Sequence, residues 1–366
     1  MKKTHVRAAA TLAAVVLLFS NLPQVKAISA RSAILMDADS GRIIYEKNPD
    51  ERSLIASTTK IMTALVVCEQ CNILDRVQVM PEAVGIEGSS MYLREGEILT
   101  VQELLYGLML HSGNDAAVAL AIYCGGTVEG FVALMNDEAR RLGLENTHFE
   151  NPNGLDNENH YSTAQDLAKL SAYAMKNEIF AKTVSTKSMR IGERYLTNHN
   201  KLLWRYEGAD GVKTGYTKAA GRILVSSAQR NGRRLVAVTI HAPDDWNDHV
   251  ALLDTGFGGY ETKTIVEAGD CVGNMVVISG DRQSIELLAE ETFTYPLAES
   301  EKITFLLPGP GFVYAPIQEG MEAGYVHVLV EGKAVGKVRV AYGDTVDQSK
   351  KAEKPSLLHR IFGGGQ

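Results

Sequence analysis

The chain is organised around one segment, Ala56-Ser57-Thr58-Thr59-Lys60-Ile61-Met62-Thr63-Ala64-Leu65. Polar residues come first and an apolar run of good helix formers follows, which predicts a helix that enters a hydrophobic core. A spacing of three places the Ser57 and Lys60 side chains on one face of that helix. A serine attacks well when a neighbouring base takes its proton, and a buried lysine of lowered pKa can be that base. The spacing is common, however, and a helix-capping serine followed by a solvated lysine is its ordinary interpretation.

Two further motifs change that interpretation. Ser112-Gly113-Asn114 stands in a tight loop between two predicted helices, where Ser112 and Asn114 can point into a cleft. Lys213-Thr214-Gly215 precedes a predicted hairpin and is expected on a strand, where Gly215 lets a ligand lie close to the backbone. We therefore expect the three motifs to meet at one site.

Together the motifs supply the groups for acyl transfer through a serine. Ser57 is the expected nucleophile and Lys60 the base that accepts its proton. The backbone N–H groups of Ser57 and Tyr216 are the expected donors to the oxyanion. Ser112 and Lys213 can pass the proton on to a leaving amine.

The remaining motif residues are expected to bind the substrate. Lys213 and Thr214 offer a positive charge and a hydroxyl to a substrate carboxylate. Asn114 can hold a substrate amide and keep Lys60 oriented. Gly215 and Tyr216 complete the expected binding strand.

With these motifs the chain resembles the serine-type D-alanyl-D-alanine carboxypeptidases, the low-molecular-mass penicillin-binding proteins. The resemblance implies an α/β fold, with a transpeptidase-like domain (an antiparallel sheet with a helical block) followed by a small all-β, sandwich-like domain. It implies removal of the terminal D-alanine from peptidoglycan stem peptides through an acyl-enzyme on Ser57, and acylation of Ser57 by β-lactam antibiotics. It implies no metal and no organic cofactor. The resemblance extends to the stretches Ser57–Leu65, Leu110–Ala117, Asn146–Leu155, His160–Leu167 and Asp210–Thr217.

Two other functions share part of this pattern. A β-lactamase must also hydrolyse its acyl-enzyme quickly, and class A enzymes do so with a glutamate that activates water. No Glu-x-x-Leu-Asn-like segment lies between Ser112 and Lys213. A penicillin-sensing or wall-binding module would keep the pocket without turnover. Because no motif residue needed for turnover is missing, we expect the carboxypeptidase.

The chain departs from the family where the substrate carboxylate is held. Relatives often carry an arginine after the second hairpin strand, but the stretch Asp244-Asp245-Trp246-Asn247-Asp248-His249 contains none. Arg222 follows the third motif and could replace that arginine, although a solvated arginine at a strand edge is the simpler interpretation. His160 could line the cleft or serve as a structural loop residue.

The predicted elements run from strands to helices and back to strands. A hairpin is expected over 31–47 around Asp39-Ser40-Gly41, and a stronger one over 223–240 around Asn231-Gly232. This order suggests one antiparallel sheet with strands from both ends of the domain. Short alternating runs after residue 262 predict a small all-β domain. Helices are expected over 100–110 (with a capping box, Thr100 to Glu103), 116–123, 128–142, from 162, and over 245–257.

The N-terminus of the chain suggests export, and the C-terminus suggests a weak membrane contact or a frayed end. Residues 1–27 contain basic residues, the apolar run 8–19 and small residues around Ala27, the pattern of a signal peptide. Its removal would change the net charge from −7 to −11, because it holds four basic residues and no acidic one. We expect a catalytic domain at 28–262, the β-rich domain at 263–345 and a tail at 346–366. Apolar and basic residues in that tail could form a weak membrane anchor, or a frayed terminus.

Charge and cysteine content exclude several other functions. An acidic exported protein is a poor partner for nucleic acid, whose binding depends on neutralising phosphates. Cys68-Glu-Gln-Cys71 has the spacing of a redox pair or half a zinc site, but no second cysteine or histidine pair completes a metal site. We interpret the four cysteines as small buried residues or incidental thiols.

Overall fold

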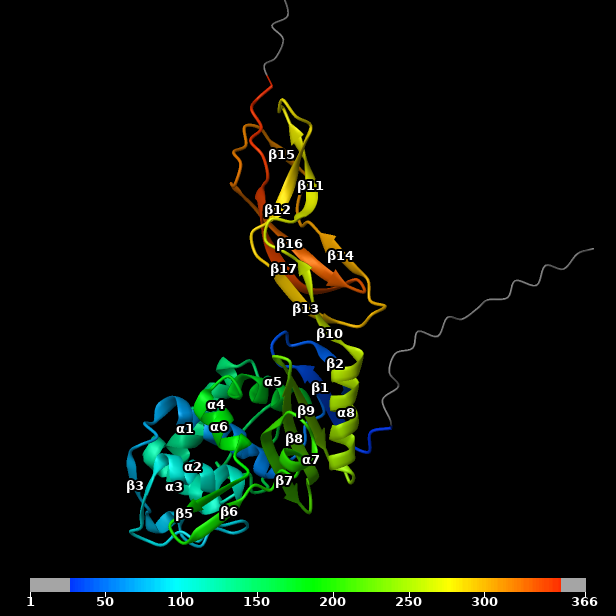
Figure 1. Cartoon of the computed structure of the whole chain (residues 1–366). Helices are drawn as coiled ribbons and strands as arrows, with labels where there is room; N and C mark the ends of the chain where they lie inside the picture. The colour runs from blue at the N-terminus through cyan, green and yellow to red at the C-terminus, as the bar shows by residue number, and fades with distance from the viewer. Residues whose placement is uncertain (1–26, 350–366) are drawn as a thin grey trace, which may run out of the picture.

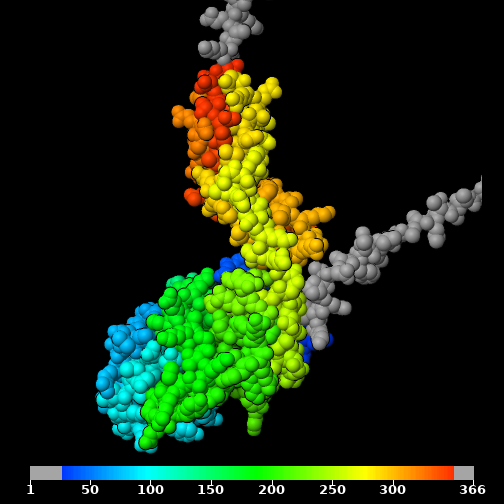
Figure 2. Space-filling view, viewed as in Figure 1, coloured from blue at the N-terminus to red at the C-terminus, as the bar shows by residue number. Residues whose placement is uncertain are grey.

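The computed structural model describes residues 27–349, which form two bodies joined near residue 260 (Figure 1). The space-filling view shows the C-terminal β-rich part projecting from the larger N-terminal part (Figure 2). Residues 1–26 and 350–366 lie outside the described part, and with them the predicted signal peptide and the predicted amphipathic tail.

The larger body is built on a five-stranded antiparallel sheet of order β2-β1-β9-β8-β7. Its first two strands come from the N-terminal hairpin and its last three from the second half of the domain, as predicted. The predicted Asn231-Gly232 turn is confirmed, and both residues have the positive φ that such a turn requires, 51° and 79°. The strands are β1 (Ser32–Asp37), β2 (Ile43–Lys47), β7 (Ala209–Thr217), β8 (Gly221–Arg230) and β9 (Arg233–Ile240).

Alternating apolar residues bury both faces of this sheet. Leu35, Leu224 and Leu235 face helix α8 (Asp245–Gly259), which covers one side (Figure 1). Ile34 and Val236 face the helical block on the other side. The block comprises α1 (Lys60–Gln70), α2 (Val101–Leu110), α3 (Asn114–Gly125), α4 (Val128–Arg141), α5 (Ala164–Ala174) and α6 (Glu178–Ser185).

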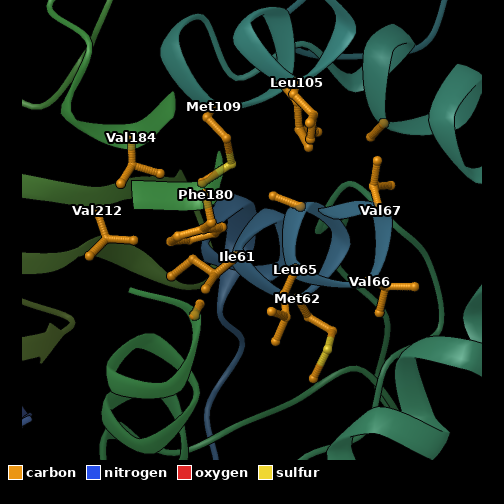
Figure 3. Packing of buried hydrophobic residues seen from close by; sticks show 14 of the residues in the cluster. Ile61, Met62, Leu65, Val66, Val67, Leu105, Met109, Phe180, Val184 and Val212 are labelled. Carbon is orange, nitrogen blue, oxygen red and sulfur yellow. The ribbon is translucent and has the colours of Figure 1, made fainter. Parts of the chain in front are cut away.

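Helix α1 is the centre of the helical block. Every residue from Lys60 to Val67 is buried, because other helices and strand β7 surround the first two turns. Figure 3 shows Ile61 next to Phe180 of α6, and Leu65 next to Met62 farther along the same helix. The apolar run after the first motif therefore forms a core helix, as the sequence predicts.

Local capping signals set the helix ends around α1. The Thr100 hydroxyl accepts the Glu103 N–H at 3.2 Å, and the Glu103 carboxylate accepts the Thr100 N–H, so the predicted capping box is confirmed. Several short elements were not predicted, since they are too short for a clear period. They are 3-10 turn η2 (Pro81–Ala83), helix α7 (Leu202–Arg205), strand β4 (Ile98–Thr100), and strand β5 (Ser188–Ile191) with its partner β6 (Arg194–Thr197). Strand β4 pairs with β3 (Arg76–Gln78), where the sequence predicts a short strand over 77–80.

The C-terminal body is all β, as predicted. Its six-stranded sheet has the order β14-β16-β17-β12-β11-β15, and β10 pairs with β13 beside it. Leu287, Val328 and Val338 belong to its separate apolar core. The strands are β10 (Glu261–Val266), β11 (Cys271–Ile278), β12 (Ser284–Ala289), β13 (Phe293–Leu297), β14 (Ile303–Leu306), β15 (Phe312–Tyr314), β16 (Glu322–Val330) and β17 (Lys333–Tyr342).

The cysteines and helices add three observations. The four cysteines are free thiols; Cys68, Cys71 and Cys124 are half-buried, and Cys271 is exposed, which fits the alternative of an incidental thiol. Within residues 27–349 no cluster of His, Cys, Asp or Glu could hold a metal ion. No single helix in this range has the length and apolar character to cross a membrane, although the bent pair α3 and α4 meets those limits jointly.

Candidate active site

Ser57 and Lys60 lie at the entrance of the central helix. Ser57 belongs to the 3-10 turn η1 (Ala56–Thr59), which continues directly into α1 at Lys60. The spacing of three brings Lys60 Nζ to 3.1 Å from Ser57 Oγ, as predicted. Lys60 is fully buried whereas Ser57 reaches a cleft, so the amine approaches the hydroxyl from inside the protein.

Two further contacts hold the Lys60 amine. It donates to Asn114 Oδ1 at 2.7 Å, as the sequence predicts, and to the Asn153 carbonyl oxygen at 2.6 Å. The Asn153 contact was not predicted, because it depends on a loop far away in sequence. A neutral amine has two N–H donors and one lone pair. Two acceptors and one hydroxyl therefore fit a neutral Lys60 that accepts the Ser57 proton, and they fit equally an ammonium that donates to all three oxygens, so burial decides between the two forms.

The loop that provides Asn153 is shaped by its own sequence. The Asn151 side chain accepts the N–H groups of Gly154 and Leu155 at 2.7 and 3.2 Å, which closes the turn. The Thr63 hydroxyl of α1 donates to the Pro152 carbonyl at 2.6 Å and ties the loop to the helix. Turn chemistry alone was predicted here, and the structure adds its role in orienting Lys60.

The electrostatics of the site favour a neutral lysine. Burial lowers the pKa of Lys60 well below its usual value, the nearby charge of Lys213 lowers it further, and Asp115 acts in the opposite direction. Burial also lowers the pKa of Lys213 to about 7. The charge of Lys213 thus disfavours protonation of Lys60, whereas burial is the cause of the lowered pKa of Lys213 itself.

The second motif begins α3 rather than standing wholly in a loop. Ser112 adopts a left-handed conformation with φ 62°, and Asn114 is the first residue of the helix. The Asp115 carboxylate accepts the N–H groups of Met91 and Leu93 at 3.1 and 3.0 Å. These bonds pin the loop before β4 against the site.

The third motif lies on edge strand β7, beside the nucleophile. A Cβ at Gly215 would lie 3.1 Å from the Ile55 carbonyl oxygen and 3.3 Å from the Ser57 nitrogen. Only glycine therefore lets β7 approach η1 without displacement. Lys213 is buried and donates from Nζ to the Thr214 carbonyl oxygen at 3.0 Å.

A cleft of about 330 Å³ joins the three motifs. From the predicted site it is lined by Ser57, Ser112, Thr214, Gly215 and Tyr216, while Lys60, Asn114 and Lys213 are buried. Other residues on its wall had no role predicted from the sequence, apart from the alternative raised for Arg222. They are Ser89, His199, Lys201, Arg222, Ile223, Asp245 and Trp246.

Two roles considered from the sequence, the proton relay of Ser112 with Lys213 and the place of His160, can be compared with the structure. In the described part of the chain the Lys213 amine makes no hydrogen bond to Ser112, so a proton relay between them stays a prediction. His160 is buried and lies 2.7 Å from Thr59 Oγ1 through Nε2, while its Nδ1 accepts the Glu150 N–H at 3.1 Å. Burial and His148 lower its pKa to about 4. His160 is the structural histidine of the two interpretations.

Comparison with known families covers almost the whole chain. Residues 20–244 match the family described as D-alanyl-D-alanine carboxypeptidase. Residues 260–348 match the family described as penicillin-binding protein 5, C-terminal domain.

Individual relatives agree with the family matches. The chain is 36% identical to D-alanyl-D-alanine carboxypeptidase DacF of Bacillus subtilis, over 91% of this chain and 89% of that protein. Penicillin-binding protein 5 from Haemophilus influenzae superposes with a TM-score of 0.74 at 32% identity, over 88% of this chain and 99% of the other. The Streptomyces K15 DD-transpeptidase superposes with a TM-score of 0.62 at 36% identity, over 64% of this chain and 99% of the other.

Proposed function

Because the chain belongs to the D-alanyl-D-alanine carboxypeptidase family, we propose that it removes the terminal D-alanine from peptidoglycan stem peptides through an acyl-enzyme on Ser57. The observation that carries this proposal is the buried Lys60 amine 3.1 Å from the Ser57 hydroxyl, at the wall of a cleft shared with the other two motifs. Lysine can act as a base only when neutral, and its lowered pKa increases the neutral fraction.

Acylation begins when Lys60 takes the Ser57 proton and Ser57 Oγ attacks the carbonyl carbon of the penultimate D-alanine. The backbone N–H groups of Ser57 and Tyr216 stabilise the oxyanion of the tetrahedral intermediate. The C–N bond then breaks, and the leaving D-alanine nitrogen receives a proton from Lys60 directly or through Ser112 and Lys213. Water attacks the ester that remains on Ser57 and releases the shortened peptide.

The substrate lies along β7 in this mechanism. Within residues 27–349, β7 pairs with β8 alone and forms the edge of the sheet, and its residues Thr214, Gly215 and Tyr216 line the cleft. Asn114 holds the amide that precedes the scissile bond, and Thr214 offers its hydroxyl to the C-terminal carboxylate. Gly215 lets the strand lie close to Ser57, because a Cβ at this position would come within 3.3 Å of the Ser57 nitrogen.

β-Lactam antibiotics present a strained amide to the same serine and form an ester with it. The enzyme works outside the cytoplasm, where its peptidoglycan substrate lies. A signal peptide at 1–27 would deliver it to the outer face of the membrane or to the wall, and the tail at 346–366 would give a weak peripheral membrane contact. The catalytic domain spans 28–262 and the β-rich domain 263–345.

A release assay tests the function. The purified enzyme is incubated with an acetylated peptide that ends in D-Ala-D-Ala, and free D-alanine is measured together with labelling by a fluorescent penicillin. We expect release and labelling, both abolished in Ser57→Ala and reduced by at least about a thousandfold in Lys60→Ala. Stable labelling without release would favour a penicillin sensor, and rapid loss of label would favour a β-lactamase.

A further inference from the structure

The substrate carboxylate needs a cation that reaches the cleft. Lys213 is only 1% exposed, and its pKa of about 7 leaves it partly neutral under physiological conditions. Lys213 does not belong to the described residues that line the cleft. On the cleft wall that the structure describes, the lysine and arginine side chains are those of Lys201 and Arg222.

Position along β7 distinguishes these two cations. The carboxylate of a terminal residue lies immediately beyond the scissile amide, so its partner must be close to Ser57. Arg222 pairs across the sheet with Tyr216, which follows Gly215, the glycine at which a Cβ would lie 3.3 Å from the Ser57 nitrogen. Lys201 follows Asn200, whose side chain donates to the Gly211 carbonyl at 2.7 Å. Gly211 is four residues from Gly215, about 13 Å along an extended strand.

Arg222 is also held in place. Its Nη2 donates to Asp245 Oδ1 at 2.7 Å, and the Asp245 side chain is 4% exposed while that of Arg222 is 45% exposed. Asp245 Oδ1 accepts the Trp246 N–H at 2.9 Å as well, which fixes the carboxylate. A guanidinium has five N–H donors in a rigid fork, so one hydrogen bond to Asp245 leaves an edge for a second carboxylate. The arrangement differs from that of a mobile, solvated arginine.

We propose that Arg222 binds the free C-terminal carboxylate of the substrate and that Asp245 is its positioning residue. Arg222 thus restricts the enzyme to peptides with an unblocked C-terminus and contributes to recognition of the carboxylate of penicillins. The proposal rests on the proposed function and names the group that selects its substrate class. Asp245 reduces the net charge at the site, and a planar, bidentate contact supplies specificity that a charge alone would not.

The test compares two substrates that differ only at the C-terminus. The kcat/KM is measured for an acetylated peptide ending in D-Ala-D-Ala and for the same peptide with a C-terminal carboxamide. Wild type is expected to prefer the free acid by at least about thirtyfold, in line with loss of a charge-assisted, bidentate contact. Arg222→Ala should lose at least about thirtyfold on the acid and less than threefold on the amide, so that the preference disappears. Arg222→Lys should recover part of it.

Two matched variants control the result. Lys201→Ala removes the other cation of the wall and should keep the wild-type ratio of acid to amide. Asp245→Asn should raise KM for the acid more than it lowers kcat, because it disturbs the position of Arg222 and not the reacting atoms. The proposal is overturned if Arg222→Ala keeps the wild-type ratio or loses both substrates equally while its circular dichroism is unchanged.

Two outcomes call for a further measurement: an Arg222→Ala variant that does not fold, and a wild type that releases no D-alanine. If Arg222→Ala does not fold, the neutral variant Arg222→Gln decides, and an unchanged ratio in that variant contradicts the proposal. If wild type releases no D-alanine, the proposed function fails separately. Labelling rates for a fluorescent penicillin and its methyl ester then provide the same comparison, and equal rates would overturn the role of Arg222.

Discussion

Lys60 shows how a single buried side chain can determine the chemistry of the site. Its amine is fully buried, donates to two oxygens and lies beside the Ser57 hydroxyl. Burying a charged ammonium is costly, so the surroundings favour the neutral amine, which is also the form that can accept a proton. The environment that lowers its pKa is the same one that makes it a base.

This environment predicts a pH dependence. A lysine of lowered pKa is protonated below that pKa and neutral above it, so Ser57 acylation should rise with pH through the pKa of Lys60. The second-order rate of labelling by fluorescent penicillin, measured from pH 4 to 9, should rise along an acid limb, and the titration of Lys213 near pH 7 should modify it. A rate that falls as pH rises over the acid side would contradict a neutral Lys60 base.

Lys213 should influence the pH at which the labelling rate rises. Its positive charge disfavours protonation of Lys60, so Lys213→Gln should raise the pKa of Lys60 and move the acid limb to higher pH. The remaining labelling by penicillin is slow but measurable at high concentration. Lys201→Gln, which removes an exposed lysine of the same cleft, should leave the limb in place. An unchanged limb in Lys213→Gln would disprove the coupling.

Among the elements, the contact between η1 and the loop of Gly154 is the least tolerant of change. Gly154 has φ +86°, and a Cβ there would lie 2.0 Å from the Ala56 carbonyl oxygen. Gly154→Ala should therefore displace the Asn153 carbonyl from Lys60, lower the stability by more than about 2 kcal/mol and greatly slow acylation.

Gly192→Ala is the matched control for Gly154. Gly192 also has positive φ, +58°, but in the described structure a Cβ there would meet no atom within 4 Å. Gly192→Ala should lower the free energy of unfolding only by the backbone strain, about 1 kcal/mol, and leave the rate of acylation unchanged. Thermal unfolding and penicillin labelling of both variants separate the clash from the strain. Equal losses in the two variants would mean that the contact with η1 has no special role.

The elements also show which features a sequence can predict. The Ser57–Lys60 contact and the Thr100 capping box are local, three residues apart, so helix geometry alone predicts them. The motif order predicted which distant residues meet, through resemblance to a family. The Asn153 carbonyl contact and the Arg222–Asp245 pair were not predicted, because they depend on how loops and a strand pack after folding.

At the scale of the whole molecule, the candidate active site and the β-rich domain belong to separate parts of the chain. Every residue assigned to the site lies before residue 262, and the two parts have separate apolar cores. Arg42 links them: its guanidinium pairs with Glu301 and lies 4.7 Å from the ring centre of Tyr260 and 5.2 Å from that of Tyr295. The Streptomyces K15 relative matches 64% of this chain with 99% of its own length, so a related protein exists without a counterpart of the second part.

A truncated chain tests this separation. Residues 28–262 should fold, and penicillin should acylate them within about threefold of the rate for the whole chain, because no group of the site is removed. Circular dichroism reports folding, and the same truncation with Ser57→Ala provides the unlabelled control. A folded truncation that no longer reacts would show that the β-rich part contributes to the site.

The central claim is that a neutral Lys60 activates Ser57 in a cleft shared by the three motifs. Intact-protein mass spectrometry after reaction with penicillin, followed by peptide mapping, tests it most directly. We predict one acyl adduct per chain, located on Ser57, and none within the same time in Lys60→Arg, whose guanidinium cannot become neutral. An adduct on any other residue, or an unchanged rate in Lys60→Arg, would contradict the claim.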